Sequence, residues 1–422
     1  MMVVLSIVVL GLVWVGVMRG YAPWVLIRAL LTQFRFANLM FVALIGISVA
    51  MGIGLIAQER GLREAGARAA DGFDLVVGAP GSEMTLMLAA VYLQPSRVNL
   101  LDGARFIEIA QDPRVALAAP LAFGDSFDGA PIIGTLSEFV THLAGEQITG
   151  RLFATSSEAV VGALSALHVG DTFTPSHGHA GDSDARHDGF DIKVVGQMPP
   201  TGTPWDRAII VPVETVWEVH GLANGHKPEH GARIGAPFDA DYFPGTPAVV
   251  VVPRGMGASY QLRTQWNRAD DMMAVFPGAL QADLYRMMGD ARQVISILTT
   301  VTQAIVAASV LLGLLILSGL VQRQLAMLKA LGAPLRFVLS VVWGHMAVLL
   351  LGGAALGLVL GYGCAMILST VITARTGVLV TPSLGLAELQ WAVGFVMLST
   401  VAALLPAWAI ARRSVIAGLR GG

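Results

Sequence analysis

Histidine side chains gather in the middle of this chain, and histidine is the commonest side-chain ligand for metal ions in proteins. Eight of the nine histidines lie between residues 58 and 292. With nearby aspartates, six of them offer the three or four nitrogen and oxygen ligands that zinc prefers: His177, His179, His187, His220, His226 and His230. The alternative is a solvated loop, because Gly, Ser and Asp dominate residues 176–191 and the spacing matches no defined zinc motif. A zinc site would release its metal near pH ~5, where imidazoles protonate.

The sequence motifs of common enzymes are missing. None of the three lysines completes the G-x-x-x-x-G-K-[ST] loop that cradles nucleotide phosphates. Neither an H-E-x-x-H zinc helix nor a G-x-S-x-G nucleophile elbow occurs. No basic patch with interleaved aromatic residues indicates nucleic acid. We therefore expect no catalytic residue in this chain, and no bound cofactor other than zinc.

Segment 321–336 predicts a short amphipathic helix. Its apolar stripe is formed by Leu325, Leu328 and Leu331, and Gly332 followed two residues later by a proline predicts its end. A helix of this kind, held between two membrane spans, is suited to docking in a groove of a cytoplasmic partner. The alternative is an interfacial helix that lies on lipid headgroups.

Charged residues divide the chain into regions of very different composition. Of the 29 acidic residues, 28 lie between residues 58 and 292, and Glu388 is the exception. The hydrocarbon core of a bilayer requires about 20 apolar residues per helical span, and a charge at its centre costs at least ~2.5 kcal/mol. Five apolar stretches have no charged residue: 1–18, 36–58, 293–322, 337–374 and 389–411. The fold class that follows is an α-helical membrane protein with four core transmembrane helices and a large mixed α+β extracytoplasmic domain inserted between core spans 1 and 2.

The predicted order along the chain follows from these stretches. It is a hydrophobic segment at 1–18, a basic amphipathic helix at 19–36, core span 1 at 37–57, the large domain at 58–292, core span 2 at 293–320, the amphipathic helix at 321–336, core span 3 at 337–373, an external loop at 374–388, core span 4 at 389–411 and a tail at 412–422. Nine of the ten Lys and Arg residues outside the domain then lie on one side, which is the cytoplasm by the positive-inside rule. For residues 1–18 the sequence leaves four alternatives open: an extra span, an interfacial helix, a cleaved signal peptide or a misassigned start codon.

Two of the core spans are longer than a bilayer requires. Residues 293–322 would make a helix of about 45 Å against a hydrocarbon core of ~30 Å, so we expect a stalk that continues into the domain. Residues 337–374 also predict a long projecting helix. In that helix Gly353, Gly357 and Gly361 lie four apart, which favours close packing against another helix.

Short apolar runs bounded by Gly, Pro and Asp alternate with helical patterns in the large domain. Strands are predicted at 73–77, 192–195, 208–213 and 248–252, and helices at 102–111, 156–167, 212–220 and 257–268. The loose stretches at 175–190 and 221–247 favour two lobes, with an outer lobe at about 125–245 and a second lobe built from both flanks. Cys364 is the only cysteine, so the chain can form no internal disulfide.

The amphipathic segment resembles the coupling-helix signature of the MacB/FtsX/LolC-type ABC transporter permeases, which reads approximately R-E-I-A-x-L-[RK]-A-L-G-A. Gln324 stands where the family has Glu. The tail after Pro406 and the strings at 73–78 and 199–207 are also similar to this family. The matching residues of the signature are Leu325, Ala326, Leu328, Lys329, Ala330, Leu331, Gly332 and Ala333.

The resemblance implies a permease subunit in the bacterial inner membrane, with its large domain in the periplasm. A separate cytoplasmic ABC ATPase would hold ATP and Mg²⁺, and its motion would drive the domain to extrude or extract a periplasmic cargo. The permease would form a homodimer, or a heterodimer with a related permease, and would meet a periplasmic adaptor or binding protein. ATPase coupling would fall to Arg323, Gln324, Leu325, Leu328, Lys329, Leu331 and Gly332.

Three other functions in this group stay open. An FtsX-like permease would switch a cell-wall hydrolase, although the large two-lobed domain argues against this. A LolC-like permease would release lipoproteins. Efflux linked to a metal or to heme is suggested by the histidine cluster alone.

Overall fold

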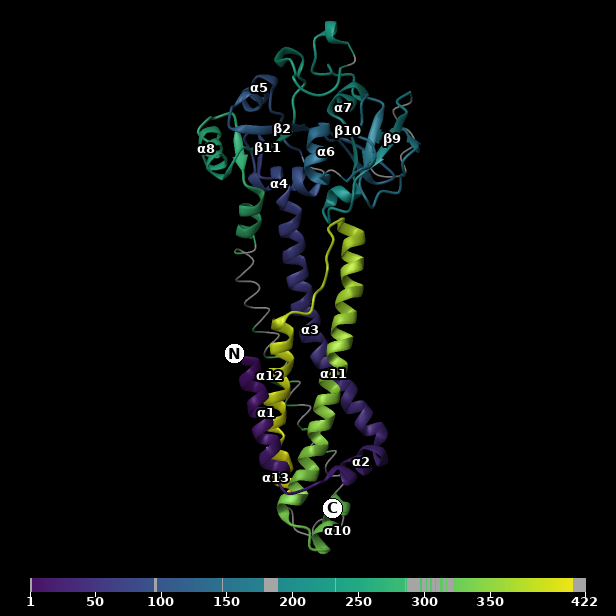
Figure 1. Ribbon diagram of the computed structural model, residues 1–422, viewed down its shortest axis with the longest axis vertical. Helices are drawn as coiled ribbons and strands as arrows, with labels where there is room; N and C mark the ends of the chain where they lie inside the picture. The colour runs from purple at the N-terminus through teal and green to yellow at the C-terminus, as the bar shows by residue number, and fades with distance from the viewer. Residues whose placement is uncertain are drawn as a thin grey trace. The chain divides into compact units, whose positions relative to one another are not determined.

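A computed structural model describes residues 2–94, 97–145, 147–177, 189–231, 233–284 and 322–412, with isolated positions between 286 and 316 (Figure 1). The chain divides into two compact units. Unit 1 consists of Met1–Leu62, Gly289–Val371 and Thr381–Gly422, and unit 2 of Arg63–Met288 and Ile372–Val380. Predicted core span 2 lies largely outside the described residues, as do His179, His187 and residues 413–422.

Helices make up the described part of unit 1. Three of them are long and apolar enough to cross a membrane: Arg35–Asp71, Leu335–Thr376 and Glu388–Ala411. The last of these covers most of two consecutive helices, α12 and α13. The helices are α1 (Met2–Met18), α2 (Trp24–Gln33), α3 (Arg35–Asp71), α10 (Gln322–Ala330), α11 (Leu335–Thr376), α12 (Leu386–Ala402) and α13 (Leu404–Ala411). The predicted long third span is thus one 42-residue helix, about 63 Å at 1.5 Å per residue.

The glycine face of α11 lies against α3. A Cβ atom added at Gly357 would lie 2.6 Å from Cβ of Val49 and 2.8 Å from the carbonyl oxygen of Gly46. Gly353 and Gly361 make equally close approaches to neighbouring turns of α3. Only a residue without a side chain fits at such distances, so these glycines set how close the two helices come.

The N-terminal helix α1 packs beside α12 (Figure 1). Trp14 of α1 also meets Trp343 of α11 edge to face, with ring centroids 5.6 Å apart. The break between α2 and α3 is held by Asn38, whose amide donates to the carbonyl oxygens of Leu30 and Leu31 at 3.1 and 3.2 Å. The Asn38 oxygen lies 3.1 Å from Nε2 of His345, so this lone histidine of the spans is a packed residue.

Unit 2 has the mixed α+β fold that the sequence predicts, with two sheets. The smaller sheet has the order β12-β1-β11-β2 and the larger has the order β5-β9-β6-β10-β4-β3-β8, with β7 paired to β9. The smaller sheet takes its strands from both flanks of the domain: β1 (Leu75–Gly78), β2 (Val115–Leu121), β11 (Ala248–Pro253) and β12 (Met273–Val275). The larger sheet uses the segment between them: β3 (Asp125–Phe127), β4 (Ala130–Thr135), β5 (Thr149–Gly150), β6 (Glu158–Val161), β7 (Thr172–Phe173), β8 (Ser176–His177), β9 (Ile192–Gln197) and β10 (Ile209–Pro212).

Helices pack with the two sheets of unit 2. They include α4 (Glu83–Tyr92), α5 (Gly103–Gln111), α6 (Ser137–Ala144), α7 (Val213–Val219), α8 (Met256–Trp266) and the 3-10 helix η2 (Pro204–Arg207). One continuous apolar core joins the two sheets, and Trp205 and Trp266 are fully buried side chains. The side chain of Asp102 accepts a hydrogen bond from the amide of Arg105 at 2.8 Å and so begins α5.

The helix predicted at 156–167 is wrong. Residues Glu158–Val161 form the buried strand β6 between β9 and β10, and residues 162–167 contain no helix. Two β-branched valines suit a strand that is covered on both sides, and pairing with strands distant in sequence outweighed the local helical spacing.

The outer edge of β12 is occupied by an asparagine side chain. Asn267 donates through Nδ2 to the carbonyl oxygen of Ala274 at 3.0 Å, and its Oδ1 accepts from the amide of Ala274 at 2.6 Å. The amide and the carbonyl oxygen of Ala274, which point away from β1, therefore both have hydrogen-bond partners inside the domain.

Candidate functional site

The segment that resembles a coupling helix forms α10, and its end is built as the sequence predicts. Gly332 adopts a left-handed conformation with φ of 92°. The amide of Ala333 donates to the carbonyl oxygen of Leu328, and the amide of Gly332 donates to that of Lys329, each at 3.0 Å. This is the double hydrogen bond of a Schellman cap, which the left-handed glycine makes possible.

The predicted apolar stripe of α10 is divided between the interior and the surface. Leu325 is 4% exposed and packs with Leu328 into the apolar cluster of unit 1, whereas Leu331 is 85% exposed. Met327, one turn before Leu331, is 46% exposed, and Arg323 is exposed on the same side. The exposed side chains of this segment therefore include Arg323, Met327 and Leu331, and the leucine stripe as a whole is not exposed.

Two polar residues of α10, Gln324 and Lys329, have polar atoms on the side of the helix that packs against the rest of unit 1. The ammonium group of Lys329 donates to the carbonyl oxygen of Ala411 at 2.6 Å, and burial lowers the pKa of this lysine. Gln324, which stands in place of the family glutamate, has a buried Oε1 with no hydrogen-bond partner among the described residues. The hydrogen bond of Lys329 ties the amphipathic helix to the end of α13.

The histidines of unit 2 contact separate carboxylates. Nε2 of His220 lies 3.8 Å from Oδ1 of Asp125, and Nδ1 of His230 lies 3.8 Å from Oδ2 of Asp239. His226 is buried beside Glu214. No group of three His, Cys, Asp or Glu side chains that could hold a metal occurs among the described residues. Since His179, His187 and the side chain of His177 lie outside them, zinc binding stays a prediction.

Glu214 and His226 form a buried polar pair between α7 and the segment that follows it. Nε2 of His226 is 3.4 Å from Oε1 of Glu214, which also accepts from the amide of Gly235 at 2.6 Å. Burial raises the pKa of Glu214 to about 7, and burial also lowers the pKa of His226. Burial thus favours the uncharged form of each of the two side chains.

Replacing Glu214 with glutamine is expected to remove part of the pH dependence of stability. A carboxyl group whose pKa rises from 4.5 to about 7 on folding binds its proton more tightly in the folded state, so stability falls as pH rises through that window. The loss amounts to roughly 3 kcal/mol above pH ~7. Thermal unfolding of the full chain at pH 5 and pH 8 measures it. The Tm of Glu214→Gln should change less between the two pH values than the Tm of the wild type does. An unchanged pH dependence in Glu214→Gln would contradict the expectation.

A buried ion pair in unit 1 was not predicted from the sequence. The guanidinium of Arg60 in α3 contacts the carboxylate of Glu388 and the carbonyl oxygen of Ser383. The other oxygen of Glu388 accepts from the amide of Gly385 at 2.9 Å and caps α12. The signal was available, because Glu388 is the only acidic residue outside residues 58–292.

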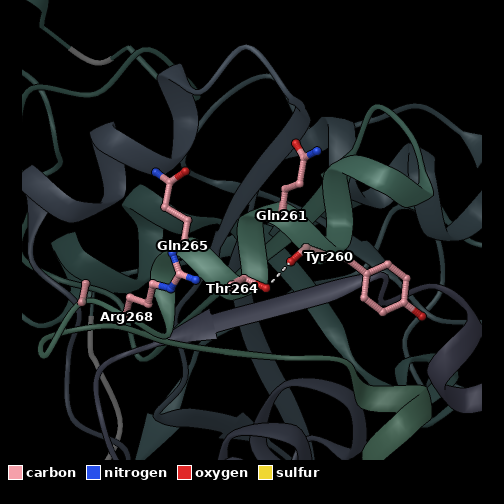
Figure 2. A pocket seen from close by; sticks show the side chains of 6 residues that line it. Tyr260, Gln261, Thr264, Gln265 and Arg268 are labelled. Atoms are coloured by element: carbon pink, nitrogen blue, oxygen red, sulfur yellow. Dashed lines mark hydrogen bonds between the residues drawn. The ribbon is translucent and has the colours of Figure 1, made fainter.

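A groove of about 730 Å³ runs beside α8 in unit 2. Figure 2 shows five of its side chains on α8 and the turn that follows, with the hydroxyl of Thr264 donating to the carbonyl oxygen of Tyr260 at 2.8 Å. The lining has no carboxylate, thiol or imidazole and therefore gives no support to an enzyme. It consists of Tyr260, Gln261, Thr264, Gln265, Arg268 and Ala269.

Comparisons with known proteins find solved structures that are similar to this chain. No protein-family profile matches the chain, and no curated protein matches it. The chain is similar to the periplasmic region of MacB from Actinobacillus actinomycetemcomitans, with 10% identity and a TM-score of 0.31 over 51% of this chain and 94% of that one. It is also similar to the extracellular domain of the noncanonic ABC-type transporter YknZ from Gram-positive bacteria, with 10% identity and a TM-score of 0.27 over 48% of this chain and 98% of that one. Both TM-scores lie below 0.5, so the case for function rests on the residues of this chain, whose coupling-helix segment resembles the family that includes MacB.

Proposed function

We propose that this chain is the membrane subunit of an ABC-type transporter of the MacB/FtsX kind. A separate ATPase chain docks on α10 from the cytoplasm, and its motion drives unit 2 in the periplasm to extrude or extract an envelope cargo. The observation that carries the proposal is α10 together with its cap, where Met327 and Leu331 stay exposed immediately before the long apolar helix α11.

The exposed side of α10 fits a groove on a protein partner. Met327 and Leu331 are spaced four residues apart, so both point to the same side of the helix. Arg323 lies one turn before them and adds a positive charge at one end. Apolar anchors at this spacing are how an amphipathic helix binds in a groove, and an exposed methionine adapts to an uneven surface.

The rest of the chain supports a protein that transmits motion between its two units, and not one that passes a substrate through a membrane channel. The sequence has no nucleotide-binding loop, so ATP is hydrolysed by a partner. No acidic residue lies in the predicted spans 37–57, 293–320, 337–373 and 389–411, so an ion-driven carrier has no carboxylate to use. The helices α3 and α11 each end with residues that belong to unit 2, namely 63–71 and 372–376. They provide a continuous backbone along which motion can pass.

Replacing Leu331 with glutamate is expected to abolish binding of the ATPase. A carboxylate in an apolar groove loses its hydration without gaining a partner, and truncating or reversing such an anchor commonly costs 2 kcal/mol or more, about a 30-fold loss of affinity. The measurement is the amount of ABC ATPase that co-purifies with the detergent-solubilised chain, quantified by mass spectrometry. Leu328 is unsuitable for this test, because it packs inside unit 1 and its replacement would disturb the fold.

The matched control is Leu222→Glu, which changes an exposed leucine of unit 2 and should leave ATPase binding unchanged. Retention of the ATPase by Leu331→Glu at the wild-type level would overturn the docking assignment. A wild-type chain that recovers no ATPase, or that hydrolyses ATP by itself, would overturn the proposed function. A periplasmic adaptor in the wild-type sample would favour extrusion, and a cell-wall hydrolase activator would favour FtsX-like regulation.

A further inference from the structure

The connection between α11 and α12 is built into unit 2. The sequence predicts a short external loop at 374–388, yet Ile372–Val380 belongs to the same compact unit as the two sheets. Val378 and Val380 pack with Ala65 in a small buried cluster, and Nη2 of Arg68 donates to the carbonyl oxygen of Leu379 at 2.9 Å. The first part of this connection, which we call the connector (residues 372–380), is therefore a packed element.

The connector packs against the loop 199–207. The sequence of this loop resembles strings of the MacB/FtsX/LolC-type group. The amide of Leu379 donates to the carbonyl oxygen of Gly202 at 3.1 Å. The guanidinium of Arg207 donates to the carbonyl oxygen of Ala374 in the last turn of α11. Gly377 has a φ of 72°, and a Cβ atom added there would lie 3.1 Å from Cδ of Arg207. A glycine is needed for so close an approach in that backbone conformation.

The loop 199–207 is itself rigid. The carboxylate of Asp206 accepts hydrogen bonds from the amides of Thr201 and Gly202, both at 2.8 Å, and from the hydroxyl of Thr201 at 2.6 Å. Trp205 is fully buried, with its ring 5.4 Å from that of Phe139. A force on this loop therefore moves it as a body, because its polar groups and its aromatic anchor are both held.

The loop joins two inner strands of the larger sheet. It runs from β9 to β10, and both strands have neighbours on each side. The amide of Leu164 donates to the carbonyl oxygen of Asp206 at 2.7 Å, which ties the loop also to the segment after β6. A displacement of the connector would therefore act on three adjacent strands at once.

We infer that Arg207 and Gly377 form a fixed attachment through which α11 moves the eight-stranded sheet of unit 2. The inference rests on the proposed function, since it requires that an ATPase moves α11 at its other end. Helix α11 begins just after α10 and ends in the connector. The inference therefore names the contact through which motion that starts at α10 would reach unit 2. Arg207 is thus a positioning residue for energy transfer.

The first test compares Arg207→Gln with the wild type in the complete complex in nanodiscs. Hydrogen exchange of β9 and β10 is measured with ADP and with a non-hydrolysable ATP analogue, beside the rate of ATP hydrolysis. In Arg207→Gln we expect ATPase binding and basal hydrolysis as in the wild type, but a nucleotide-dependent change in exchange reduced about fivefold or more. Arg207→Lys, which can still donate to the carbonyl oxygen of Ala374, should restore much of the change.

The matched control is Arg254→Gln, because Arg254 donates to the carbonyl oxygen of Pro113 at 3.1 Å and makes the same kind of contact away from the connector. It should behave as the wild type. A full nucleotide-dependent change in Arg207→Gln would overturn the inference while leaving the proposed function intact. If hydrogen exchange in the wild-type complex is the same with ADP and with the ATP analogue, the proposed function is overturned, and the inference with it.

A cross-link separates a fixed attachment from a contact that opens during the cycle. A Cβ atom added at Gly202 would lie 3.5 Å from Cβ of Leu379, inside the range of about 3.5–4.5 Å that disulfides span. The pair Gly202→Cys and Leu379→Cys is made in a Cys364→Ser background, since Cys364 is the only native cysteine. The oxidised chain should keep the wild-type nucleotide response in exchange. Loss of that response on oxidation, with recovery on reduction, would show an opening contact and overturn the inference.

Discussion

Replacing Gly357 with leucine is expected to lower the stability of unit 1, because the glycine lies in close contact with α3. The added Cβ would lie 2.6 Å from Cβ of Val49 and 2.8 Å from the carbonyl oxygen of Gly46, and the second of these atoms belongs to backbone that cannot rotate away. Helices α3 and α11 must therefore separate. Overpacking of this kind costs about 1–3 kcal/mol in a well-packed core, and a helix contact made through glycines lies at the upper end.

The measurement is thermal unfolding of the detergent-solubilised chain, followed by tryptophan emission. The matched control is Gly363→Leu, on the same helix, where an added Cβ meets no atom within 4 Å. We expect a fall of several degrees in the Tm of Gly357→Leu and little change in Gly363→Leu. Equal Tm values for the two variants would show that the glycine face is not a packing surface.

Replacing Glu388 with glutamine should destabilise the contact between α3 and the start of α12 by about 3 kcal/mol. The side chain of Glu388 is 1% exposed and that of its partner Arg60 is 22% exposed. Removing one partner of a buried pair leaves the other charge uncompensated, which typically costs 3–5 kcal/mol, and the partial exposure of Arg60 places this pair at the lower end. Glutamine keeps the shape and still accepts from the amide of Gly385, so the loss reports the charge.

A double-mutant cycle isolates this pair. Arg60→Met alone, Glu388→Gln alone and both changes together are compared by thermal unfolding, and the double variant should be more stable than the sum of the single losses predicts. The exposed pair of Arg286 and Asp283 is the control, since surface pairs contribute only about 0–1 kcal/mol. Strictly additive losses at Arg60 and Glu388 would mean that the two charges do not stabilise each other.

Local chemistry explains which parts of the fold could be predicted from the sequence. The end of α10 was predictable because a Schellman cap depends on one left-handed glycine and its neighbours. The strands β1, β9, β10 and β11 were predictable because each is a short apolar run between turn residues. The long helix α11 follows from 38 positions without a charge.

Features that depend on residues far apart in the sequence could not be predicted. Strand β6 is stabilised by β9 and β10, and neither neighbour is visible in the local pattern of Glu158–Val161. Arg60 and Glu388 are 328 positions apart, so only the isolation of Glu388 in the sequence hinted at a partner. The exposed side of α10 could not be told from its spacing, because it is the packing of Leu325 into unit 1 that turns Leu331 outward.

The asparagine at the edge of the smaller sheet has a consequence for aggregation. An open strand edge recruits strands from other molecules, which leads to aggregation. Asn267 occupies both backbone groups of Ala274 that such a strand would need. A strand from a neighbouring molecule therefore finds no free backbone group of Ala274 to pair with at this edge of β12.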